Sequence, residues 1–249
     1  MKIQLIRNAT LRLNYAGKTI LIDPMLGPKG SYDSLAGIEP NPTVDLPVPL
    51  ADVLAGVDLV IVSHLHRDHF DDTAKAELPK DWPLFCQPAD QAAIEEAGFT
   101  AVRAIEDAID WEGIHIQRTG GTHALGDWAA RLNPVSGFVF SAEGEPTLYW
   151  IGDSVWCDAV GAALAAHQPD VIVTHSGGAR LGDSGLILMD EAQTLQVAAA
   201  VPGAAVLAVH QEALDHCTVT RAALRAAVEA AGEGDRVFVL EDGEEVEIE

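Results

Sequence analysis

The sequence predicts a mixed α/β or α+β domain with layered sheets, and three features of the chain support this prediction. Strand-like runs open the chain, whereas its remainder alternates between strand-like runs and helical patterns. The 249 residues have a hydrophobic content of 48%, which is enough to bury a large core. No linker divides the sequence, so we expect a single domain over residues 1–249.

The first part of the chain predicts a meander of strands that is followed by a long loop. Three strands are expected at residues 3–6, 11–15 and 19–22, where apolar and β-branched side chains are frequent. Ala16 and Gly17 predict a turn, and Asp23 with Pro24 ends the last strand. Residues 24–49 are rich in Pro and Gly and too long for an ordinary connection, so we expect an active-site wall or a lid.

Helical patterns alternate with apolar runs in the remainder of the chain. Helices are expected at residues 88–97, 155–166, 190–200 and 218–231. Gly232 is placed to act as a C-cap for the last of these helices. The acidic tail at residues 241–249 has the form of an interaction tail, but the alternation around Val246 and Ile248 fits an edge strand better.

The most informative motif is His64-Leu65-His66-Arg67-Asp68-His69, which follows the apolar run at residues 59–62. Side chains two apart in an extended segment point the same way, so His64 and His66 can bind one cation together. Asp68 and His69 fall in the following turn, from which they can face a second cation. The alternative is a solvated His-rich loop, but such a loop seldom follows an apolar strand so abruptly.

Three further polar residues each end an apolar run. His123 follows residues 114–117, Asp153 follows residues 148–151, and His210 follows residues 204–209. Taken singly, each histidine could be an ordinary loop residue, and Asp153 could cap a helix that begins near Val155.

The pattern His-x-His-x-Asp-His resembles the signature of the metallo-β-lactamase superfamily, and further similarity runs along nearly the whole chain. Family members take their remaining ligands from a His, an Asp and a final His, each on a loop after a separate strand. This chain offers His123, Asp153 and His210 in that order. The resemblance implies a four-layer αββα sandwich with the metals at one edge, between the two sheets.

The resemblance also implies two divalent metal ions and assigns their ligands. The first ion would be bound by His64, His66 and His123. The second would be bound by Asp68, His69 and His210. Asp153 would bridge the two ions, and Asp23 would orient a ligand imidazole, although a plain turn residue is the alternative at that position. Imidazole and carboxylate ligands suit zinc or manganese and leave iron open.

The branch of the superfamily is indicated by residues 22–24 and 137–154. These segments resemble bacterial proteins grouped with L-ascorbate-6-phosphate lactonase and N-acyl-phosphatidylethanolamine phospholipase D, which hydrolyse ester-like bonds. The resemblance therefore implies a metal-dependent hydrolase in which a hydroxide between the metals cleaves a lactone or phosphodiester of a small molecule. The alternatives are an iron-dependent oxidative enzyme on the same fold and a non-catalytic metal-binding protein.

Other polar residues are candidates for the substrate pocket. His175 stands where the relatives more often carry Pro, and His216 follows His210 closely. Either imidazole is a candidate proton donor to the leaving group, with Asp68 helping to take the proton from water, and a satisfied loop histidine is the alternative. Less specific candidates are Glu212, a reactive thiol at Cys217, and anion binding by Arg180 and Arg221.

Composition narrows the classes of partner. The net charge is −23 and only 15 Lys and Arg residues are scattered along the chain, so a nucleic acid is a poor candidate substrate. The low aromatic content of 6% argues mildly against a membrane lipid, and the absence of long apolar runs favours a cytoplasmic protein. We expect a small-molecule substrate, and a homo-oligomer is compatible with the sequence.

Cysteine usage argues against a disulfide framework. The three cysteines are odd in number and widely spaced. Cys86 and Cys157 are expected to be small buried residues.

Overall fold

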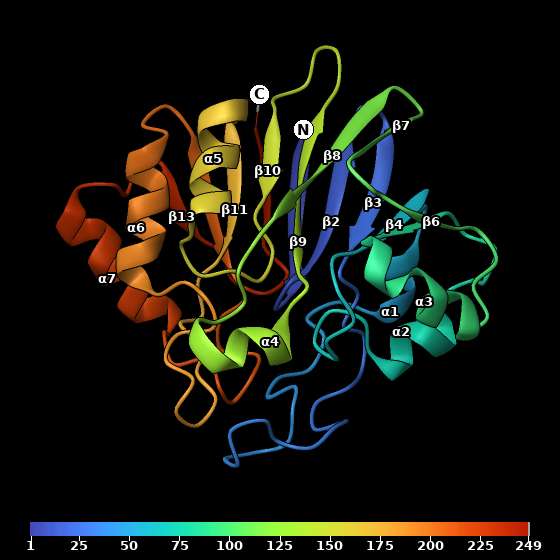
Figure 1. The fold of residues 1–249 in the computed structure, drawn as a ribbon, viewed down its shortest axis with the longest axis horizontal. Helices are drawn as coiled ribbons and strands as arrows, with labels where there is room; N and C mark the ends of the chain where they lie inside the picture. Colours follow the sequence, from blue (N-terminus) through green and yellow to red (C-terminus); the bar gives the residue numbers. More distant parts are fainter. Residues whose placement is uncertain (249) are drawn as a thin grey trace.

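Two seven-stranded sheets pack face to face in the computed structural model, which describes residues 1–248 (Figure 1). Helices α1 (Leu50–Leu54), α2 (Asp72–Glu77) and α3 (Gln91–Glu96) cover the outer face of the first sheet (Figure 1). Helices α5 (Asp158–His167), α6 (Glu191–Ala200) and α7 (Arg221–Ala231) cover the outer face of the second (Figure 1). This arrangement confirms the predicted four-layer αββα sandwich.

The first sheet has the strand order β14-β1-β2-β3-β4-β5-β6. Its strands are β1 (Lys2–Arg7), β2 (Thr10–Tyr15), β3 (Lys18–Ile22), β4 (Leu59–Val62), β5 (Leu84–Cys86), β6 (Val102–Ala104) and β14 (Glu245–Glu247). Strands β1 to β3 form the predicted antiparallel meander, and β3 to β6 are parallel. The tail forms β14 beside β1, which confirms the expected edge strand.

The second sheet has the strand order β13-β12-β11-β10-β9-β8-β7. Its strands are β7 (Ala108–Trp111), β8 (Ile114–Gly120), β9 (Ser136–Ser141), β10 (Leu148–Trp150), β11 (Val171–His175), β12 (Ala205–Val209) and β13 (Val237–Val239). Strands β10 to β13 are parallel, whereas β7 to β10 pair antiparallel. In both sheets the parallel strands alternate with helical segments, as the sequence predicts.

The helices are α1 (Leu50–Leu54), α2 (Asp72–Glu77), α3 (Gln91–Glu96), α4 (Ala129–Leu132), α5 (Asp158–His167), α6 (Glu191–Ala200) and α7 (Arg221–Ala231). Thr220 caps the first turn of α7, and Gly232 ends that helix with a left-handed φ of 71°, as predicted. The expected start of α5 near Val155 is wrong, because α5 begins at Asp158 after Cys157. Asp153 is therefore not a helix cap.

The core lies between the two sheets and consists of apolar side chains from both. Ile3, Leu11 and Ile61 from the first sheet pack in one cluster with Phe138 and Trp150 from the second. Truncation of a buried aromatic ring such as Phe138 to Ala should cost about 3–5 kcal/mol of stability. The sheets are thus held rigidly against each other, and so are the loops at their edges.

Two expectations about other parts of the chain can be compared with the structure. Cys86 is buried as predicted, but the burial expected of Cys157 is wrong because that side chain is only half-buried; all three cysteines are free. No helix within residues 1–248 is long and apolar enough to cross a membrane.

Candidate metal centre

Six loops that follow strands meet at one edge of the sandwich. They follow β3 and β4 of the first sheet and β8, β10, β11 and β12 of the second. Carboxyl ends of parallel strands share an edge, so polar residues at those ends are brought together. The structure places Asp23, the His64–His69 motif, His123, Asp153, His175 and His210 at this edge, with contacts between members from both sheets.

The Asp153 carboxylate stands at the centre of this cluster and is almost fully buried. One or other of its oxygens lies 3.1 to 3.8 Å from the Nε2 atoms of His64, His69, His123 and His210. Oδ2 faces His64, His69 and His123, whereas Oδ1 faces His210. Asp153 therefore contacts histidines of both groups defined below, as a ligand shared between two cations must.

The first group of donor atoms belongs to His64, His66, His123 and Asp153, which can each offer one ligand atom within 4.8 Å of the others. His64 Nε2 and His66 Nδ1 lie only 2.9 Å apart, as expected of side chains two residues apart on an extended segment. The sequence analysis assigned His64, His66 and His123 to one ion, and the structure brings them together.

The second group consists of His69, Asp153, His175 and His210, again with donor atoms within 4.8 Å of one another. Asp68 stands beside this group, because its Oδ2 lies 3.2 Å from His210 Nε2 and 3.5 Å from His69 Nε2. The structure therefore brings Asp68, His69 and His210 together, as the sequence analysis expected, and adds His175.

The ligand rings are held from behind by their Nδ1 atoms. Asp23 Oδ2 accepts a hydrogen bond from His69 Nδ1 at 2.7 Å and another from Ser63 Oγ at 2.6 Å. Ser63 Oγ in turn lies 3.0 Å from His64 Nδ1, so Asp23 supports two rings at once. His123 Nδ1 donates to the Ile187 carbonyl at 2.7 Å. These contacts leave the Nε2 atoms directed at the centre, which is how ligand imidazoles are fixed.

The side chains of the first group have the protonation states that bind metals. Burial lowers the pKa of His64 well below its ordinary value and lowers that of His123 to about 4, so both rings are neutral. Burial raises the pKa of Asp153, but the surrounding imidazoles outweigh burial and hold that pKa well below its usual range. A neutral imidazole and an ionised carboxylate are the forms that donate electron pairs to a cation.

His175 and His216 lie in different places. His175 is fully buried at the end of β11, and its Nδ1 lies 2.6 Å from Asp153 Oδ1. Its ring meets the Trp150 ring edge-on. His216 instead lines the pocket described below. The structure thus places His175 against the buried Asp153 carboxylate and His216 in the lining of the pocket.

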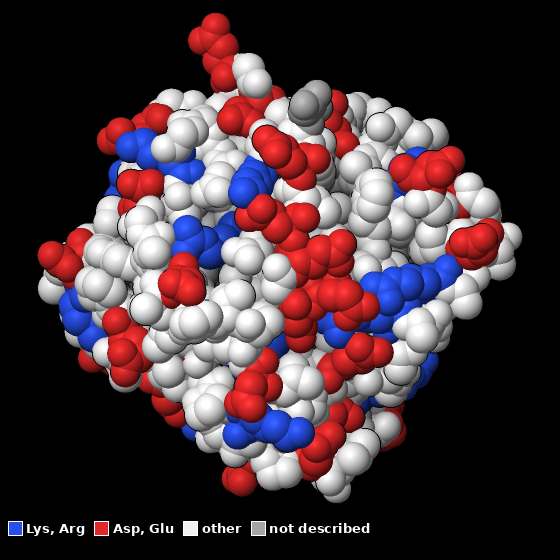
Figure 2. All heavy atoms as spheres, turned by 180° about the vertical axis from the view of Figure 1, so that it is seen from behind, with Lys and Arg blue, Asp and Glu red and all other residues white. Residues whose placement is uncertain are grey.

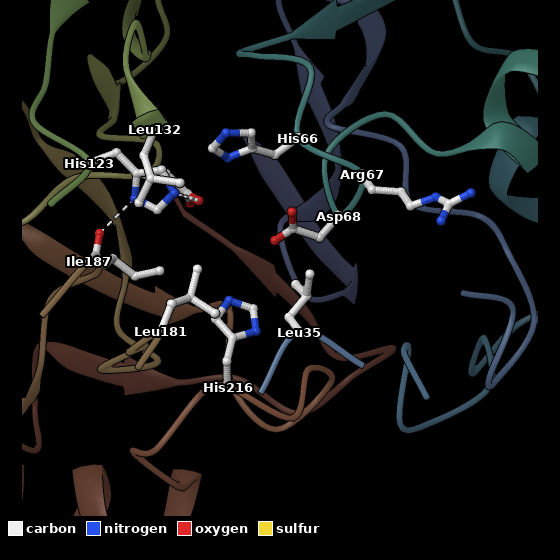
Figure 3. A pocket seen from close by; sticks show the side chains of 10 residues that line it. Leu35, His66, Arg67, Asp68, His123, Leu132, Leu181, Ile187 and His216 are labelled. Atoms are coloured by element: carbon white, nitrogen blue, oxygen red, sulfur yellow. Dashed lines mark hydrogen bonds and ion pairs between the residues drawn. The ribbon is translucent and has the colours of Figure 1, made fainter. Parts of the chain in front are cut away.

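Members of the first donor group, His66, His123 and Asp153, border a pocket of about 160 Å³ (Figure 3). Its polar lining residues are His66, Asp68, His123, Asp153 and His216, and its apolar lining residues are Leu35, Leu132, Leu181 and Ile187. Asp68 and His216 both border the pocket, whereas the Arg67 guanidinium points away from it (Figure 3). Leu35 belongs to residues 24–49, so this segment provides a wall of the pocket, one of the two roles expected for it.

The remaining sequence candidates have structural partners elsewhere. The Arg221 guanidinium is buried and pairs with Glu212 at 2.8 Å and with Asp242, so neither Arg221 nor Glu212 faces the pocket. Arg180 is exposed, and the pocket lining does not include it. Cys217 Sγ lies 3.6 Å from His210 Nδ1, and burial raises the pKa of its thiol, which disfavours a reactive thiolate.

Sequence reasoning missed Asn8, Ser63 and the apolar lining of the pocket. Asn8 is fully buried in the turn after β1, and its Nδ2 lies 3.2 Å from the Asp68 carbonyl and 3.3 Å from His210 Nε2. Its φ of 59° is one that Asn tolerates better than most residues. The sequence gives only a weak signal for its role, namely a polar residue in a turn between two apolar strands.

The residues present fit a metal centre. The buried Nε2 atoms of His69 and His175 have no hydrogen-bond partner, and a buried polar atom without a partner is costly. A cation among the Nε2 atoms would satisfy His69 and would separate the crowded ring nitrogens of His64 and His66. The donor set lacks thiolate, which is compatible with zinc, manganese or iron.

Comparison with known proteins agrees with this geometry. A family model described as a β-lactamase superfamily domain matches residues 18–211. UPF0173 protein YddR of Bacillus subtilis (strain 168) is 40% identical over 250 residues, which cover 98% of each chain.

Two solved structures are similar over almost their whole lengths. One is isothiocyanate hydrolase from Delia radicum gut bacteria, with 38% identity, a TM-score of 0.94, and coverage of 100% of this chain and 99% of that one. The other is a possible metal-dependent hydrolase from Veillonella parvula DSM 2008, with 35% identity, a TM-score of 0.96, and coverage of 99% and 98%.

Proposed function

The chain belongs to the β-lactamase superfamily and is a metal-dependent hydrolase, and from this premise we propose that it hydrolyses small, neutral, apolar electrophiles, with isothiocyanates as the first candidate class. The observation that carries the proposal is the pocket, in which His66, His123 and Asp153 of the first donor group face walls made of leucine and isoleucine. A solved relative with 38% identity is an isothiocyanate hydrolase, which supports the choice of class.

The dimensions of the pocket support a small substrate. Its volume is about 160 Å³, well below the roughly 300–1,000 Å³ typical of sites for drug-sized ligands. An apolar cavity of about 150 Å³ in another protein holds a benzene molecule. A single ring or a short alkyl group therefore fits against Leu132, Leu181 and Ile187.

The charges around the pocket support a neutral substrate. Arg67 is the basic side chain in the lining, and its guanidinium is turned away and paired with Asp72 at 2.6 Å. An anionic phosphodiester would therefore meet no side-chain cation here. A lactone is the second candidate, because its carbonyl carbon is electrophilic and neutral and would meet the same apolar walls.

We propose a dinuclear centre in which His64, His66 and His123 hold one ion, Asp68, His69 and His210 hold the other, and Asp153 bridges them. Divalent cations held there would supply hydroxide at neutral pH and would neutralise the negative charge that develops on the substrate. Addition of water to the central carbon of an isothiocyanate gives a thiocarbamate, which releases an amine and carbonyl sulfide.

The chain's own residues manage orientation and proton transfer. Asp68 and His216 both line the pocket, so one can accept a proton from water while the other donates one to the departing nitrogen (Figure 3). The apolar side chains exclude bulk water and hold the substituent. His175 keeps Asp153 in place through their 2.6 Å contact.

The test is a hydrolysis assay on protein loaded with zinc or with manganese. Benzyl isothiocyanate should release benzylamine, and γ-lactones and an activated phosphodiester serve as the comparison substrates. The His64→Ala variant should lose more than about 100-fold in activity, because even loss of a residue behind a ligand costs about 10–100-fold. His115→Ala is the matched control, since His115 is an exposed imidazole on β8.

Each outcome of this assay discriminates between the candidates. Metal-dependent release of benzylamine supports the isothiocyanate class. Opening of lactones without amine release would replace it with the second candidate. Phosphodiester cleavage alone would contradict the neutral-substrate proposal.

A further inference from the structure

The side chain of Asp215 holds a loop that lies 174 to 181 residues away in the sequence. Its carboxylate accepts hydrogen bonds from Ser34 Oγ and, at 3.2 to 3.5 Å, from backbone N–H groups of the loop. These N–H groups belong to Leu35, Ala36, Ile38 and Glu39. The backbone contacts are long, so the bond from Ser34 and the number of donors, rather than any one N–H group, hold the loop to the carboxylate.

The base of the same loop is closed as well. Tyr32 and Asn41 exchange two backbone hydrogen bonds of 2.9 Å, so residues 32–41 form a compact loop whose ends meet. The Asn41 side chain donates to Asp215 Oδ1 at 2.8 Å and accepts from the Asp215 N–H at 2.9 Å. Thr43 also donates its N–H to the Ala213 carbonyl at 2.8 Å. We refer to residues 32–41 as the clamped loop.

The electrostatics of Asp215 agree with this geometry. Burial raises the pKa of its carboxyl, but the hydrogen bonds from Ser34 and Asn41 outweigh burial and hold that pKa below its usual range. The carboxylate is therefore ionised at neutral pH and available to all of its donors.

The clamp joins two sides of the pocket. Leu35, on the clamped loop, and His216, directly after Asp215, both line the pocket and lie close to one another at its opening (Figure 3). The Leu35 side chain is 45% exposed and lines the pocket, so part of its surface is open to a substrate that enters there. The metal centre does not need this loop, because the donor groups described above contain none of residues 32–41.

We propose that the clamped loop is the specificity-determining wall of the pocket, that Leu35 is its substrate-contacting residue, and that Asp215 is the positioning residue that sets its distance from the metal centre. The substrate feature selected is the size of an apolar substituent, with a single ring as the upper limit. This inference rests on the proposed function for the identity of the reactive group, but not for the selection by size.

The clamp is tested without any substrate, by hydrogen–deuterium exchange on the metal-loaded protein. In Asp215→Ala the amides of residues 35, 36 and 38 should exchange faster than in the wild type, and Asp215→Asn, which keeps one acceptor oxygen, should restore part of the protection. Asp33→Ala removes an exposed carboxylate from the same loop and is the matched control. Equal exchange in Asp215→Ala and wild type would overturn the positioning role.

Selection by size is tested with methyl, benzyl and 1-naphthylmethyl isothiocyanate. In Leu35→Ala and in Asp215→Ala the ratio of kcat/KM for the naphthylmethyl over the methyl compound should rise by about 10-fold or more. In Leu35→Trp the ratio for benzyl over methyl should fall by a similar factor, mainly through KM. Leu125→Ala, a change at an exposed leucine outside the pocket lining, is the matched control. Ratios that stay within about twofold of the wild-type values in all three variants would contradict the proposal that the clamped loop selects substrates by size.

Failure of the proposed function is distinguishable from failure of this inference. If the wild type hydrolyses no isothiocyanate, binding of benzyl alcohol and 1-naphthylmethanol is measured by ligand-observed NMR on the same variants. If Leu35→Ala binds naphthylmethanol better relative to benzyl alcohol, selection by size at the clamped loop is supported even then. Unchanged relative binding overturns selection by size.

Discussion

At the scale of single residues, the site depends most on Asp153, because within residues 1–248 no other carboxylate contacts both groups of donor atoms. Replacement by Asn keeps the size of the side chain but removes the negative charge between the cations. We expect Asp153→Asn to retain at most one ion per chain and to lose activity. Elemental analysis after gel filtration measures the ions, with Asp158→Asn at an exposed position as the control. Two ions per chain in Asp153→Asn would remove the bridge from the proposed centre.

His175 allows a second prediction at this scale, because its two candidate roles differ in what they do to metal affinity. Its Nδ1 contacts Asp153 at 2.6 Å and its ring is fully buried, so we expect it to position the bridging carboxylate. His175→Leu should weaken metal binding by about 10–100-fold. His175→Asn, which keeps a donor near the same place, should recover part of this loss. Competition with a chromogenic chelator measures the affinity.

If His175 only donates a proton to the leaving group, His175→Leu would lower kcat on substrates with poor leaving groups and leave metal affinity unchanged, which would contradict the positioning role. That result would return His175 to the proton-donor role that its place after an apolar strand suggested.

At the scale of elements, Gly177 shows how closely the loops after β11 and β12 approach. A Cβ atom at this position would lie 2.2 Å from the His210 carbonyl oxygen and 2.8 Å from Cys217 Sγ. Gly177→Ala should therefore push the His210 loop away and destabilise the protein by about 1–3 kcal/mol. Urea denaturation measures the loss. Gly203→Ala is the control, since a Cβ there meets nothing within 4 Å. Equal stability of the two variants would contradict the close approach of the His210 loop to Gly177.

The elements also show what the sequence could predict and why. Strands β1 to β4 and the end of α7 were predicted closely, because alternation, turn residues and a glycine cap are local signals. The clustering of the candidate ligands was predictable, since each lies in the segment that follows a strand. The start of α5 was not, because Asp153 is used by the cluster rather than as a cap.

Contacts between loops left no comparable signal in the sequence. Asp215 binds backbone N–H groups of residues 35, 36 and 38, and a backbone donor carries no sequence information. The pocket walls likewise combine leucines from distant loops, and each of them alone resembles an ordinary core residue. Such features depend on how the two sheets pack, so they become visible only in three dimensions.

At the scale of the whole molecule, the net charge of −23 should make stability depend on salt. Asp and Glu side chains are spread over the face seen in Figure 2, with Lys and Arg in smaller groups. Their mutual repulsion opposes the compact state, and the Debye length falls from about 30 Å at 0.01 M salt to about 10 Å at 0.1 M. We expect the melting temperature of metal-loaded protein to rise over this range. A fall would mean that attractive ion pairs dominate.

Removal of the metal should destabilise the whole molecule, because the donor groups join loops from both sheets. The His64–His69 motif follows β4 of the first sheet, whereas His123, Asp153 and His210 follow strands of the second. A ligand at about 100 to 1,000 times its Kd stabilises the folded state by roughly 2.7 to 4.1 kcal/mol. For a chain of this length each kcal/mol shifts the Tm by about 2–4 °C, so a chelator should lower the Tm by about 5–15 °C. Asp153→Asn should respond much less, since its bound metal is already reduced. A Tm that chelation leaves unchanged in the wild type would show that the two sheets are held by their apolar core alone and that the metals serve only the chemistry.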